Sequence, residues 1–463
     1  MLPKRQKFLV LGLSRSGKSV ATFLLSRGAA VYVYDDVTGE RATRTAEELS
    51  SLGAHTVEKE KLDETAKLCD VLVLSPGIPI DHPLAVYFKR NKKSVVGETE
   101  IAARFMRCPV VAVTGTNGKT TTVSMLTAVL NDGGYTATAC GNIGVPMVEF
   151  CSLEDTDVAV AEISSFQMET LNSLRPHIAV VLNVTEDHLN RHYTMDNYIF
   201  LKGKLLKNGT EAEYAVLNYD DKTVRGFAEL TKSQTLYFSV RERVNGAYLE
   251  DGTLYFQDEK IMRADELFTG GMHNVQNALA VICCAKLMGV DNTSIARTLA
   301  EFKGVKHRIQ LVAEVDGVRY VDDSKGTNVD ATIKAVQTVT GETVLLLGGK
   351  DKGYDYGKLF AYLQNSTVVH AVLYGENRYK LLQSARERSF ERITVCKSFD
   401  FALKIATLQA KAGQTVLLSP ASASFDEFSS YEERGDAFAE YVQTLAKEKS
   451  KPTEDGVDEA ENE

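Results

Sequence analysis

Short apolar runs that end in Gly, Ser or Asp alternate with amphipathic stretches along almost the whole chain. The runs KFLVLG, AAVYVYD, VLVLSPG and SVVG come first, VVAVTG, VAVAEISS and HIAVVLNV follow, and VRYVDD, VLLLGG, VVHAVLYG, ITVC and TVLLSP come last. Apolar runs bounded by turn residues are typical of buried parallel strands, and the stretches between them are long enough for helices. The pattern predicts an α/β fold in which helices cover parallel sheets.

The grouping of these runs predicts three domains, as does the length of 463 residues. We expect a Rossmann-like N-terminal domain over residues 1–98 and a central P-loop-type mononucleotide-binding domain over 99–304. The central domain includes a β-rich patch near Tyr214–Ile261 and a helix from Asn274. A Rossmann-like C-terminal domain follows over 305–446. Residues 447–463 turn polar and then acidic, and so few apolar residues predict a disordered tail.

The segment Val110–Thr122, VVAVTGTNGKTTT, joins an apolar run to a glycine turn and the start of an amphipathic helix. The turn holds Gly115 and Gly118, and Lys119 opens the helix. Such a turn aims backbone N–H groups and a helix N-terminus at one place, which makes a phosphate site. We expect Lys119 to reach the outer phosphates of ATP and the Thr120 hydroxyl to bind the accompanying Mg²⁺. The alternative is a plain strand–turn–helix with a solvated lysine.

A second loop, nearer the N-terminus, matches the written P-loop pattern G-x-x-x-x-G-K-[ST] to the letter. It spans Gly12–Ser19, whereas the later loop has Val113 in place of the pattern's first glycine. The upstream loop follows the run KFLVL, and the next expected strand, Ala30–Tyr34, ends in Asp35. A glycine turn with an acid about 20 residues further on is typical of a Rossmann unit whose acid binds a ribose or base. Lys18 is then an exposed helix residue; alternatively, the glycines serve only strand–helix packing.

Composition and charge exclude several classes of protein. The formal net charge of −9 argues against nucleic acid as a main partner. No run of about 18 apolar residues predicts a membrane span, and Arg15 and Lys18 interrupt the apolar start too early for a signal peptide. The cysteines lack paired metal-type spacing and read as free thiols in a reducing compartment. They are Cys69, Cys108, Cys140, Cys151, Cys283, Cys284 and Cys396. We therefore expect a cytoplasmic protein.

Polar side chains follow two further strands of the central domain. The run Val158–Ile163 carries Glu162 into SSFQ, and the run Ile178–Val184 leads to His188. Taken singly, a glutamate at the end of a strand is usually a solvated residue at the sheet edge, and a histidine in a loop is usually a solvent-exposed residue. Ligands of parallel sheets bind beyond the carboxyl ends of the strands. Because Glu162 and His188 both follow strands that end at the edge carrying the phosphate loop, the sequence favours a ligand-binding site there.

With these motifs together, the chain resembles the Mur ligases from Lys7 to about Ala446. The shared marks are TGTNGKTT (114–121), Glu162 and His188. Motifs typical of the family's D-glutamate-adding member are EISSFQ (162–167), NVTEDHLNRH (183–192), DSKGTN (323–328), LLGGKDKG (346–353) and LSPASASFDEF (418–428). The D-N-P-R motif of the members that add a diamino acid does not occur in the sequence.

The resemblance implies an ATP-dependent ligase of peptidoglycan precursor synthesis. An acceptor carboxylate attacks the γ-phosphate of ATP to give an acyl phosphate, and the amine of an amino acid displaces phosphate to form an amide. The implied substrates are UDP-N-acetylmuramoyl-L-alanine and D-glutamate. Residues 1–98 would bind the UDP substrate, 99–304 ATP, and 305–446 the amino acid. Because two anions must approach one another, positioning and positive charge dominate the first step.

The resemblance also implies two Mg²⁺ ions and a modified lysine. One ion is assigned to Thr120 and Glu162 and the second to His188, with Lys202 near the second as a carbamate formed from CO₂. Lys119 completes the catalytic set. A lysine normally has a pKa of about 10.4, so a pocket that lowers this pKa would let CO₂ add. The alternative is an ordinary surface lysine.

Further contacts follow from matched positions. The ATP contacts are Gly115, Thr116, Asn117, Gly118, Lys119, Thr120, Thr121, Asn277, Arg308, Asp323 and Lys325. The UDP-substrate contacts are Ser14, Arg15, Ser16, Asp35, Gly77, Asn142 and His188. The amino-acid contacts are Thr327, Lys352, Ser424 and Phe425. Lys352 would pair with a substrate carboxylate, and Ser424 alone could instead be the N-cap of a helix that follows its strand. The pair Asp36-Val37 departs from the family's Thr-Arg, which affects uracil binding.

Three rival functions remain at this point. The first is a sibling ligase with another amino acid or another stereoisomer of glutamate. The second is an NTP-binding switch without catalysis, which the intact Lys119, Thr120, Glu162 and His188 oppose. The third is a dehydrogenase that uses the loop at Gly12, which leaves most of the chain unexplained. We further expect a monomer that neither binds nucleic acid nor inserts into a membrane.

Overall fold

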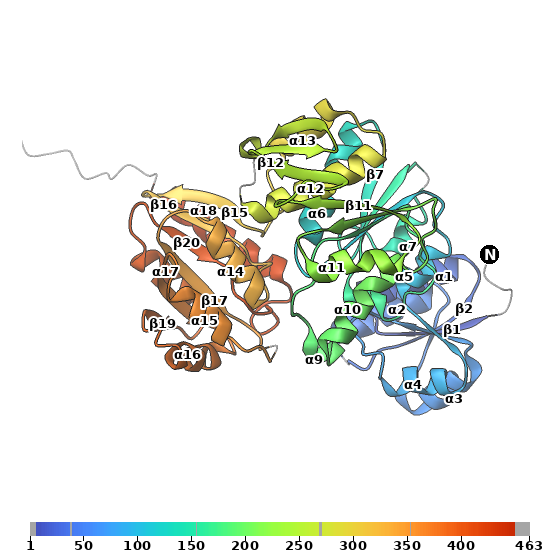
Figure 1. Cartoon of the computed structure of the whole chain (residues 1–463). Coiled ribbons are helices and arrows are strands. Elements are labelled where there is room, and N and C mark those ends of the chain that lie inside the picture. Colours follow the sequence, from blue (N-terminus) through green and yellow to red (C-terminus); the bar gives the residue numbers. More distant parts are fainter. Residues whose placement is uncertain (1–5, 38, 154, 268–270, 352, 450–463) are drawn as a thin grey trace, which may run out of the picture. The chain divides into compact units, whose positions relative to one another are not determined.

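The computed structural model describes residues 6–37, 39–153, 155–267, 271–351 and 353–449. The chain divides into two compact units, with the main boundary between Phe302 and Lys303. Figure 1 shows the sheets and helices of each unit. The expected α/β architecture is confirmed, because each unit holds largely parallel strands covered by helices.

The N-terminal sheet lies in unit 1, has the strand order β3-β2-β1-β4-β5 and is parallel throughout. This is the arrangement of a Rossmann half, with β1 in the middle. Its strands are β1 (Lys7–Leu11), β2 (Ala30–Tyr34), β3 (His55–Thr56), β4 (Val71–Leu74) and β5 (Ser94–Val96). Its helices are α1 (Arg15–Ser26), α2 (Glu40–Ser51), α3 (Leu62–Leu68), α4 (Pro83–Arg90) and α5 (Glu98–Ala103).

The central sheet of unit 1 has the order β14-β13-β12-β11-β10-β9-β6-β8-β7. It is parallel from β12 to β7, and β13 and β14 add an antiparallel ribbon. Its strands are β6 (Val110–Thr114), β7 (Ala137–Gly141), β8 (Val158–Glu162), β9 (Ile178–Val181), β10 (Tyr214–Asn218), β11 (Gln234–Ser239), β12 (Gly246–Glu250), β13 (Thr253–Phe256) and β14 (Glu259–Arg263).

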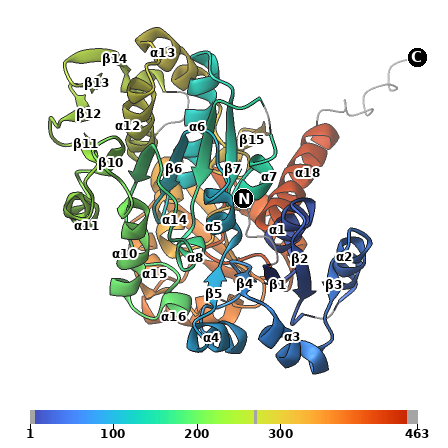
Figure 2. The ribbon, with the colours of Figure 1, turned by 90° about the vertical axis from the view of Figure 1, so that its right-hand side faces the viewer.

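Helices α6 and α12 lie side by side on one face of the central sheet, as Figure 2 shows. The helices of this part are α6 (Lys119–Asp132), α7 (Met147–Phe150), α8 (Ser165–Met168), α9 (Leu189–His192), α10 (Met195–Gly203), α11 (Lys222–Gly226), α12 (Met272–Leu287) and α13 (Asn292–Glu301). Short 3₁₀ helices are η1 (Lys59–Lys61), η2 (Lys204–Leu206), η3 (Phe227–Leu230) and η4 (Ala264–Glu266).

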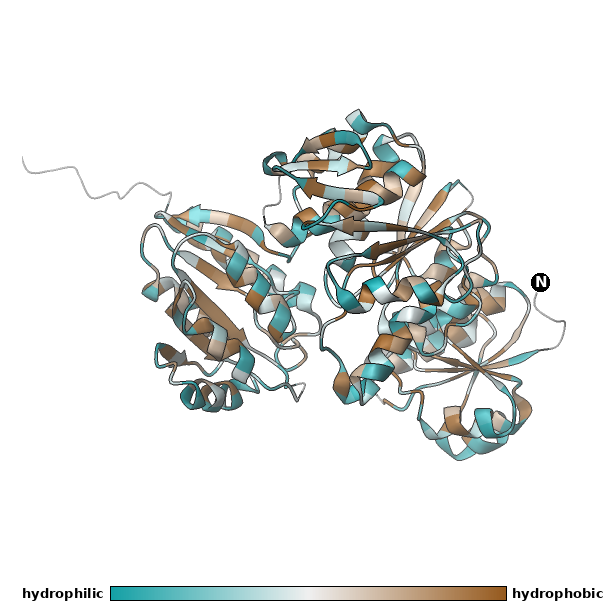
Figure 3. Ribbon diagram, in the orientation of Figure 1, coloured by the Kyte–Doolittle hydropathy of each residue, from teal (hydrophilic) through white to brown (hydrophobic). Residues whose placement is uncertain are grey.

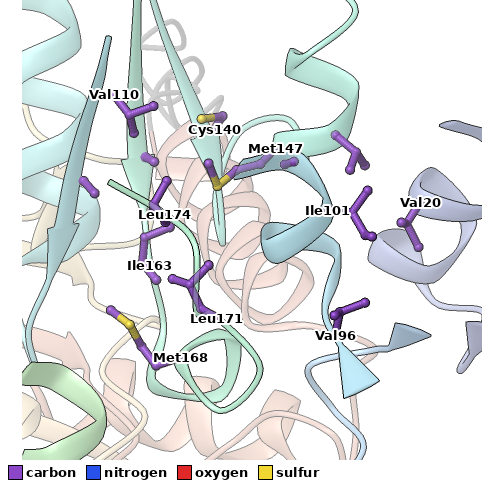
Figure 4. Packing of buried hydrophobic residues seen from close by; sticks show 14 of the residues in the cluster. Val20, Val96, Ile101, Val110, Cys140, Met147, Ile163, Met168, Leu171 and Leu174 are labelled. Atoms are coloured by element: carbon purple, nitrogen blue, oxygen red, sulfur yellow. The ribbon is translucent and has the colours of Figure 1, made fainter. Parts of the chain in front are cut away.

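A single hydrophobic core joins the N-terminal sheet to the central sheet within unit 1. Helix α1 packs against α5 and α7, and Figure 4 shows Val20 and Ile101 on the N-terminal side of this core with Met147 and Ile163 on the central side. Burying a large aliphatic side chain contributes about 1.5–3 kcal/mol. The N-terminal and central domains therefore pack together through this shared core.

Unit 2 contains a sheet of order β15-β16-β20-β17-β18-β19, parallel except for the edge strand β15. In Figure 3 its central strands are brown, which marks the apolar runs seen in the sequence. The strands are β15 (Gln310–Val315), β16 (Val318–Asp322), β17 (Thr343–Gly348), β18 (Val368–Tyr374), β19 (Ile393–Val395) and β20 (Thr415–Leu418). The helices are α14 (Val329–Thr338), α15 (Gly357–Leu363), α16 (Arg378–Glu387), α17 (Phe399–Gln409) and α18 (Tyr431–Lys449).

A few elements differ from the expectation. Strands β8 and β9 end at Glu162 and Val181, earlier than the apolar runs do, because the chain turns to present polar side chains. The predicted β-rich patch is present as β10–β14. Helix α18 extends to Lys449, past the predicted start of the tail at 447, and residues 450–463 lie outside the described residues.

The expectations about thiols and membranes can also be compared with the structure. All seven cysteines are free, as predicted. None of the helices in the described ranges has the length and apolar character that crossing a bilayer requires.

Candidate active site

The carboxyl ends of three neighbouring strands form the candidate site. Strand β6 lies between β8 and β9 and is parallel to both, with Val113 opposite Glu162 and Thr114 opposite Val181. The predicted convergence of the phosphate loop and Glu162 on one sheet edge is therefore confirmed.

Two glycines give the loop after β6 its shape. Gly115 has φ +157° and Gly118 has φ +86°, conformations that residues with a side chain rarely adopt. A Cβ at Gly118 would also collide with Oδ1 of Asn277 on α12. Asn277, predicted from the resemblance alone, thus lies directly against the loop.

The amides of the loop divide into two groups. The N–H groups of Thr116 and Asn117 donate to the backbone O and to Oδ1 of Asn183, at 2.9 and 2.8 Å. These two N–H groups therefore stabilise the loop and do not point toward a ligand. Helix α6 begins at Lys119, as predicted, and the first N–H groups of a helix have no partner within it. The N-terminus of a helix favours an anion.

Lys119 folds back onto its own loop. Its Nζ donates to the carbonyl oxygens of Gly115 and Thr116, at 2.8 Å each. Within the described residues, the buried hydroxyl of Thr121 has no hydrogen-bond partner. An unsatisfied buried hydroxyl is costly, so an oxygen-rich ligand such as phosphate fits this place.

Thr120, Glu162 and Asn142 form one hydrogen-bonded group. Oγ1 of Thr120 donates to Oε2 of Glu162 at 2.8 Å, and Nδ2 of Asn142 donates to Oε1 at 2.8 Å. Thr120 and Glu162 are buried. Hydroxyl and carboxylate oxygens are ligands that Mg²⁺ prefers, so the pair fits this ion.

The described residues contain no group of three or more His, Cys, Asp or Glu side chains that could hold a metal. Mg²⁺ usually keeps several waters and takes further ligands from phosphates.

Lys202 points from α10 into the interior and is only 1% exposed. Its Nζ donates to the carbonyl of Gly115 at 2.8 Å and lies over the ring of Tyr198. Burial and the neighbouring charge of Lys119 hold the Lys202 pKa well below its ordinary value. The alternative of a surface lysine is therefore wrong, and a buried amine with a lowered pKa beside the phosphate loop fits a carbamate.

His188 takes the left-handed conformation, with φ +55°. Its ring lies 4.7 Å from that of Phe166, centroid to centroid, and its Nε2 lies 3.5 Å from the carboxylate of Asp187. Such a conformation costs a non-glycine residue about 1 kcal/mol or more. The turn positions His188 after β9, on the edge where Glu162 lies.

The upstream loop at Gly12 differs from a phosphate loop. Gly12 has φ +87°, and a Cβ at Gly17 would collide with the Gly12 carbonyl. Its glycines thus allow α1 to pack closely. Lys18 is exposed, as predicted, and pairs with Glu48.

The remaining UDP-substrate candidates lie around this loop and the neighbouring strands. Ser14 precedes α1, and Ser16 lies in its first turn. Arg15 donates to the carbonyl of Gly144 at 2.5 Å. Asp35 accepts from the amide of Leu13 at 2.6 Å, while Gly77 lies in the loop after β4.

In unit 2, Arg308, Asp323 and Lys325 lie close together around the end of β16. Asp323 is buried and accepts from Oγ of Ser419 at 2.6 Å, and burial raises the Asp323 pKa to about 7. Nε of Arg308 is buried without a partner in the described part of the chain. Nζ of Lys325 donates to the Tyr431 hydroxyl at 3.0 Å.

The amino-acid candidates of unit 2 can be located in part. Thr327 is half-buried, Ser424 is buried and Phe425 is 69% exposed. Lys352 lies outside the described residues. The N-cap interpretation of Ser424 is wrong, because the next helix, α18, begins only at Tyr431. The Ser424 carbonyl instead accepts from the amide of Phe428, which closes a turn.

Sequence reasoning missed two residues that shape the site. Asn183 holds the phosphate loop, and Asp187 is buried within electrostatic range of Lys202. Both belong to the motif NVTEDH, whose polar residues after an apolar strand were the available signal.

Family profiles match the chain in three successive parts. The Mur ligase MurD-like N-terminal domain matches residues 6–97, the Mur ligase middle domain 113–285, and the Mur ligase glutamate ligase domain 307–422.

Curated relatives match almost the whole chain. The UDP-N-acetylmuramoylalanine–D-glutamate ligase of Pelotomaculum thermopropionicum is 42% identical over 456 residues, which cover 96% of this chain and 98% of the relative. The enzyme of the same name from Caldanaerobacter subterraneus subsp. tengcongensis is 40% identical over 96% of this chain and 99% of its own.

Among solved structures, the UDP-N-acetylmuramate-alanine ligase MurC of Thermotoga maritima superposes with a TM-score of 0.61 at 18% identity. The match covers 95% of this chain and 99% of that one. The MurF ligase of the same organism, in complex with ADP, gives a TM-score of 0.59 at 18% identity over 91% of this chain and 96% of that one. The profiles and the near-full-length relatives together show that the chain belongs to the Mur ligase family.

Proposed function

We propose that the chain joins D-glutamate to UDP-N-acetylmuramoyl-L-alanine, with ATP hydrolysis, in peptidoglycan precursor synthesis. The observation that carries the proposal is the 42% identity, over 96% of the chain, to a relative named for this reaction. The buried Thr120–Glu162 pair beside the phosphate loop supports phosphate chemistry at the same place.

The first step needs an acceptor carboxylate to attack the γ-phosphate of ATP. We assign the phosphates to the loop Gly115–Thr121, where the N-terminus of α6 favours negative charge. Lys119 would leave the carbonyls of Gly115 and Thr116, 2.8 Å away, and turn to the outer phosphates. Asn277, which lies against Gly118, would contact the nucleotide.

Mg²⁺ would neutralise phosphate charge when bound, and Thr120, Glu162 and His188 would hold the two ions. Asn142 keeps the Glu162 carboxylate oriented through its 2.8 Å bond. A carbamate on Lys202 would supply a further anionic ligand, and the burial of the amine favours its uncharged, reactive form.

The other substrates are assigned to the flanking domains. Ser14, Arg15, Ser16, Asp35 and Gly77 would bind the UDP moiety, and Asn142 and His188 would contact the sugar end. Arg308, Asp323 and Lys325 would add nucleotide contacts. Thr327, Lys352, Ser424 and Phe425 would bind D-glutamate, whose carboxylates suit a lysine and hydroxyl donors. We propose a cytoplasmic monomer.

Phosphate release from ATP, with nucleotide-sugar acceptors crossed against amino acids, tests the proposal. We expect release only when UDP-N-acetylmuramoyl-L-alanine and D-glutamate are both present. Release with another amino acid would identify a sibling activity. Release with neither substrate present would indicate an NTP-driven switch and refute the proposal.

A further inference from the structure

The short helix α9 connects the candidate metal end of the site to the candidate uridine end. It begins directly after His188, and the left-handed residue Tyr193, with φ +66°, follows it. The loop after β4 in the N-terminal sheet, residues 75–82, contains Gly77, a proposed UDP contact. Two side chains from the α9 turn, Arg191 and Tyr193, reach this loop.

Arg191 makes the stronger of these links. Its Nη2 donates to the carbonyl of Ile78 at 2.6 Å, and its Nη1 donates to that of Gly77 at 3.3 Å. The same guanidinium binds both carboxylate oxygens of Glu169, with Nε–Oε1 at 2.9 Å and Nη2–Oε2 at 2.6 Å. The arginine side chain is 12% exposed and that of Glu169 is 6% exposed. Shielded, bidentate, charge-assisted bonds of this kind are among the stronger polar contacts in proteins.

The surroundings of Arg191 keep this arrangement in place. Its guanidinium lies 5.3 Å from the ring centroid of Phe166, which also contacts His188. Burial alone would raise the pKa of Glu169, but nearby His192, whose Nδ1 lies 3.3 Å from Oε1, and the hydrogen bonds from Arg191 outweigh it and hold that pKa below the ordinary value. The carboxylate is therefore charged near neutral pH and keeps the arginine paired.

We infer that Arg191 is a positioning residue that fixes the Gly77 loop, and with it the uridine end of the acceptor, relative to His188. This inference rests on the proposed function, since it needs a UDP-linked acceptor. Arg191 sits three residues after His188 on one turn, so the bonds to residues 77 and 78 set how far the acceptor's carboxylate extends toward the phosphate loop. Tyr193, whose hydroxyl donates to Asp81 at 2.5 Å, holds the same loop further out.

The test compares two acceptors in two forms of the protein. The full acceptor, UDP-N-acetylmuramoyl-L-alanine, is compared with N-acetylmuramoyl-L-alanine 1-phosphate, which lacks the uridine monophosphate. In Arg191→Ala we expect kcat/KM for the full acceptor to fall roughly tenfold or more. The KM for ATP and kcat/KM for the truncated acceptor should change less than about twofold, because neither ATP nor the truncated acceptor contacts the loop of residues 75–82 in this proposal. If Arg191 had only a structural role, kcat/KM would fall equally with both acceptors.

Two further variants and one binding measurement protect the test against misfolding. Arg191→Lys keeps a positive charge facing Glu169 but has only three donors, so it cannot bond both carboxylate oxygens and both carbonyls together, and its loss should be intermediate. Arg104→Gln is the control, because Arg104, the residue that follows α5, also pairs with a buried glutamate, Glu100. Calorimetry should show that each variant still binds UDP within about threefold of the unaltered protein.

Equal losses with both acceptors, or no loss with either, would overturn the inference while leaving the proposed function intact. If the unaltered protein fails to turn over the full acceptor, the proposed function is refuted and the inference with it.

Discussion

Lys202 offers a prediction in which stability and activity change in opposite directions. Replacing Lys202 with Met removes the amine but keeps most of the side-chain volume at a position that is 1% exposed. The hydrogen bond from Nζ to Gly115 is lost, which costs about 0.5–1.5 kcal/mol. A second effect on the free energy of unfolding has the opposite sign, because burial and the charge of Lys119 hold the Lys202 pKa well below its ordinary value.

The sign of the pH effect follows from the lowered pKa. Between that pKa and the ordinary value of about 10.4, the unfolded chain binds a proton that the folded chain does not. The lysine therefore destabilises the fold at neutral pH, by at most about 1.4 kcal/mol for each pH unit between the working pH and the ordinary pKa, and stability rises with pH in this window. We expect Lys202→Met to be more stable at pH 7, with the difference shrinking toward pH 10.

Urea unfolding followed by circular dichroism, at pH 7 and pH 9.5 in CO₂-free buffer, measures this difference. Lys207→Met, at an exposed lysine of the same stretch, is the matched control and should change stability by less than about 0.5 kcal/mol. Phosphate release should fall about 100-fold or more in Lys202→Met, and short carboxylic acids should restore part of it. A Met variant that is less stable at pH 7, or a stability gap that grows with pH, would show that Lys202 is charged in the fold and refute the reasoning.

Three other substitutions test separate parts of the account. Lys119→Ala should lower turnover about 1000-fold by removing charge from the outer phosphates; wild-type rates would contradict the phosphate assignment. Gly118→Ala should weaken ATP binding and lower stability by about 1–3 kcal/mol, because Gly118 has φ +86° and the new Cβ would strike Asn277. The control Gly134→Ala, at φ +88° in open space, should cost only the backbone strain. Equal losses of stability in thermal melts of the two variants would count against the Asn277 contact. Burial raises the pKa of Glu98 to about 7, so the carboxyl group's stabilising contribution is present below about pH 4.5 and is lost, by about 3 kcal/mol, as pH rises through 7. Glu98→Gln should remove this slope from a stability–pH profile, and an unchanged slope would assign it elsewhere.

Local patterns predicted most of the fold. The apolar runs became strands, and the glycine turn before Lys119 became a loop that opens a helix, because both depend on residues adjacent in sequence. Strand β15 was not among the expected runs; its sequence QLVAEV is only partly apolar, since it is an edge strand with much of its surface exposed. The N-cap interpretation of Ser424 was wrong because a turn, invisible to the pattern, separates it from α18.

The site was harder to predict where a side chain's role depends on residues far away in sequence. The sequence could indicate Glu162 beside the loop, because parallel strands share an edge. It could not show that Lys202 is buried against Gly115, or that Asn183 occupies two loop amides. Arg191 lies within the motif NVTEDHLNRH, but the motif did not indicate its role, since its partners lie 22 and 113 residues away.

The location of the nucleotide phosphates tests the central claim most directly. A crystal structure of the chain with a non-hydrolysable ATP analogue and Mg²⁺ should show the phosphates against residues 115–121, with the Lys119 amine turned toward them and a metal ion at Thr120. Phosphate density at residues 12–19, with the later loop empty, would contradict the account.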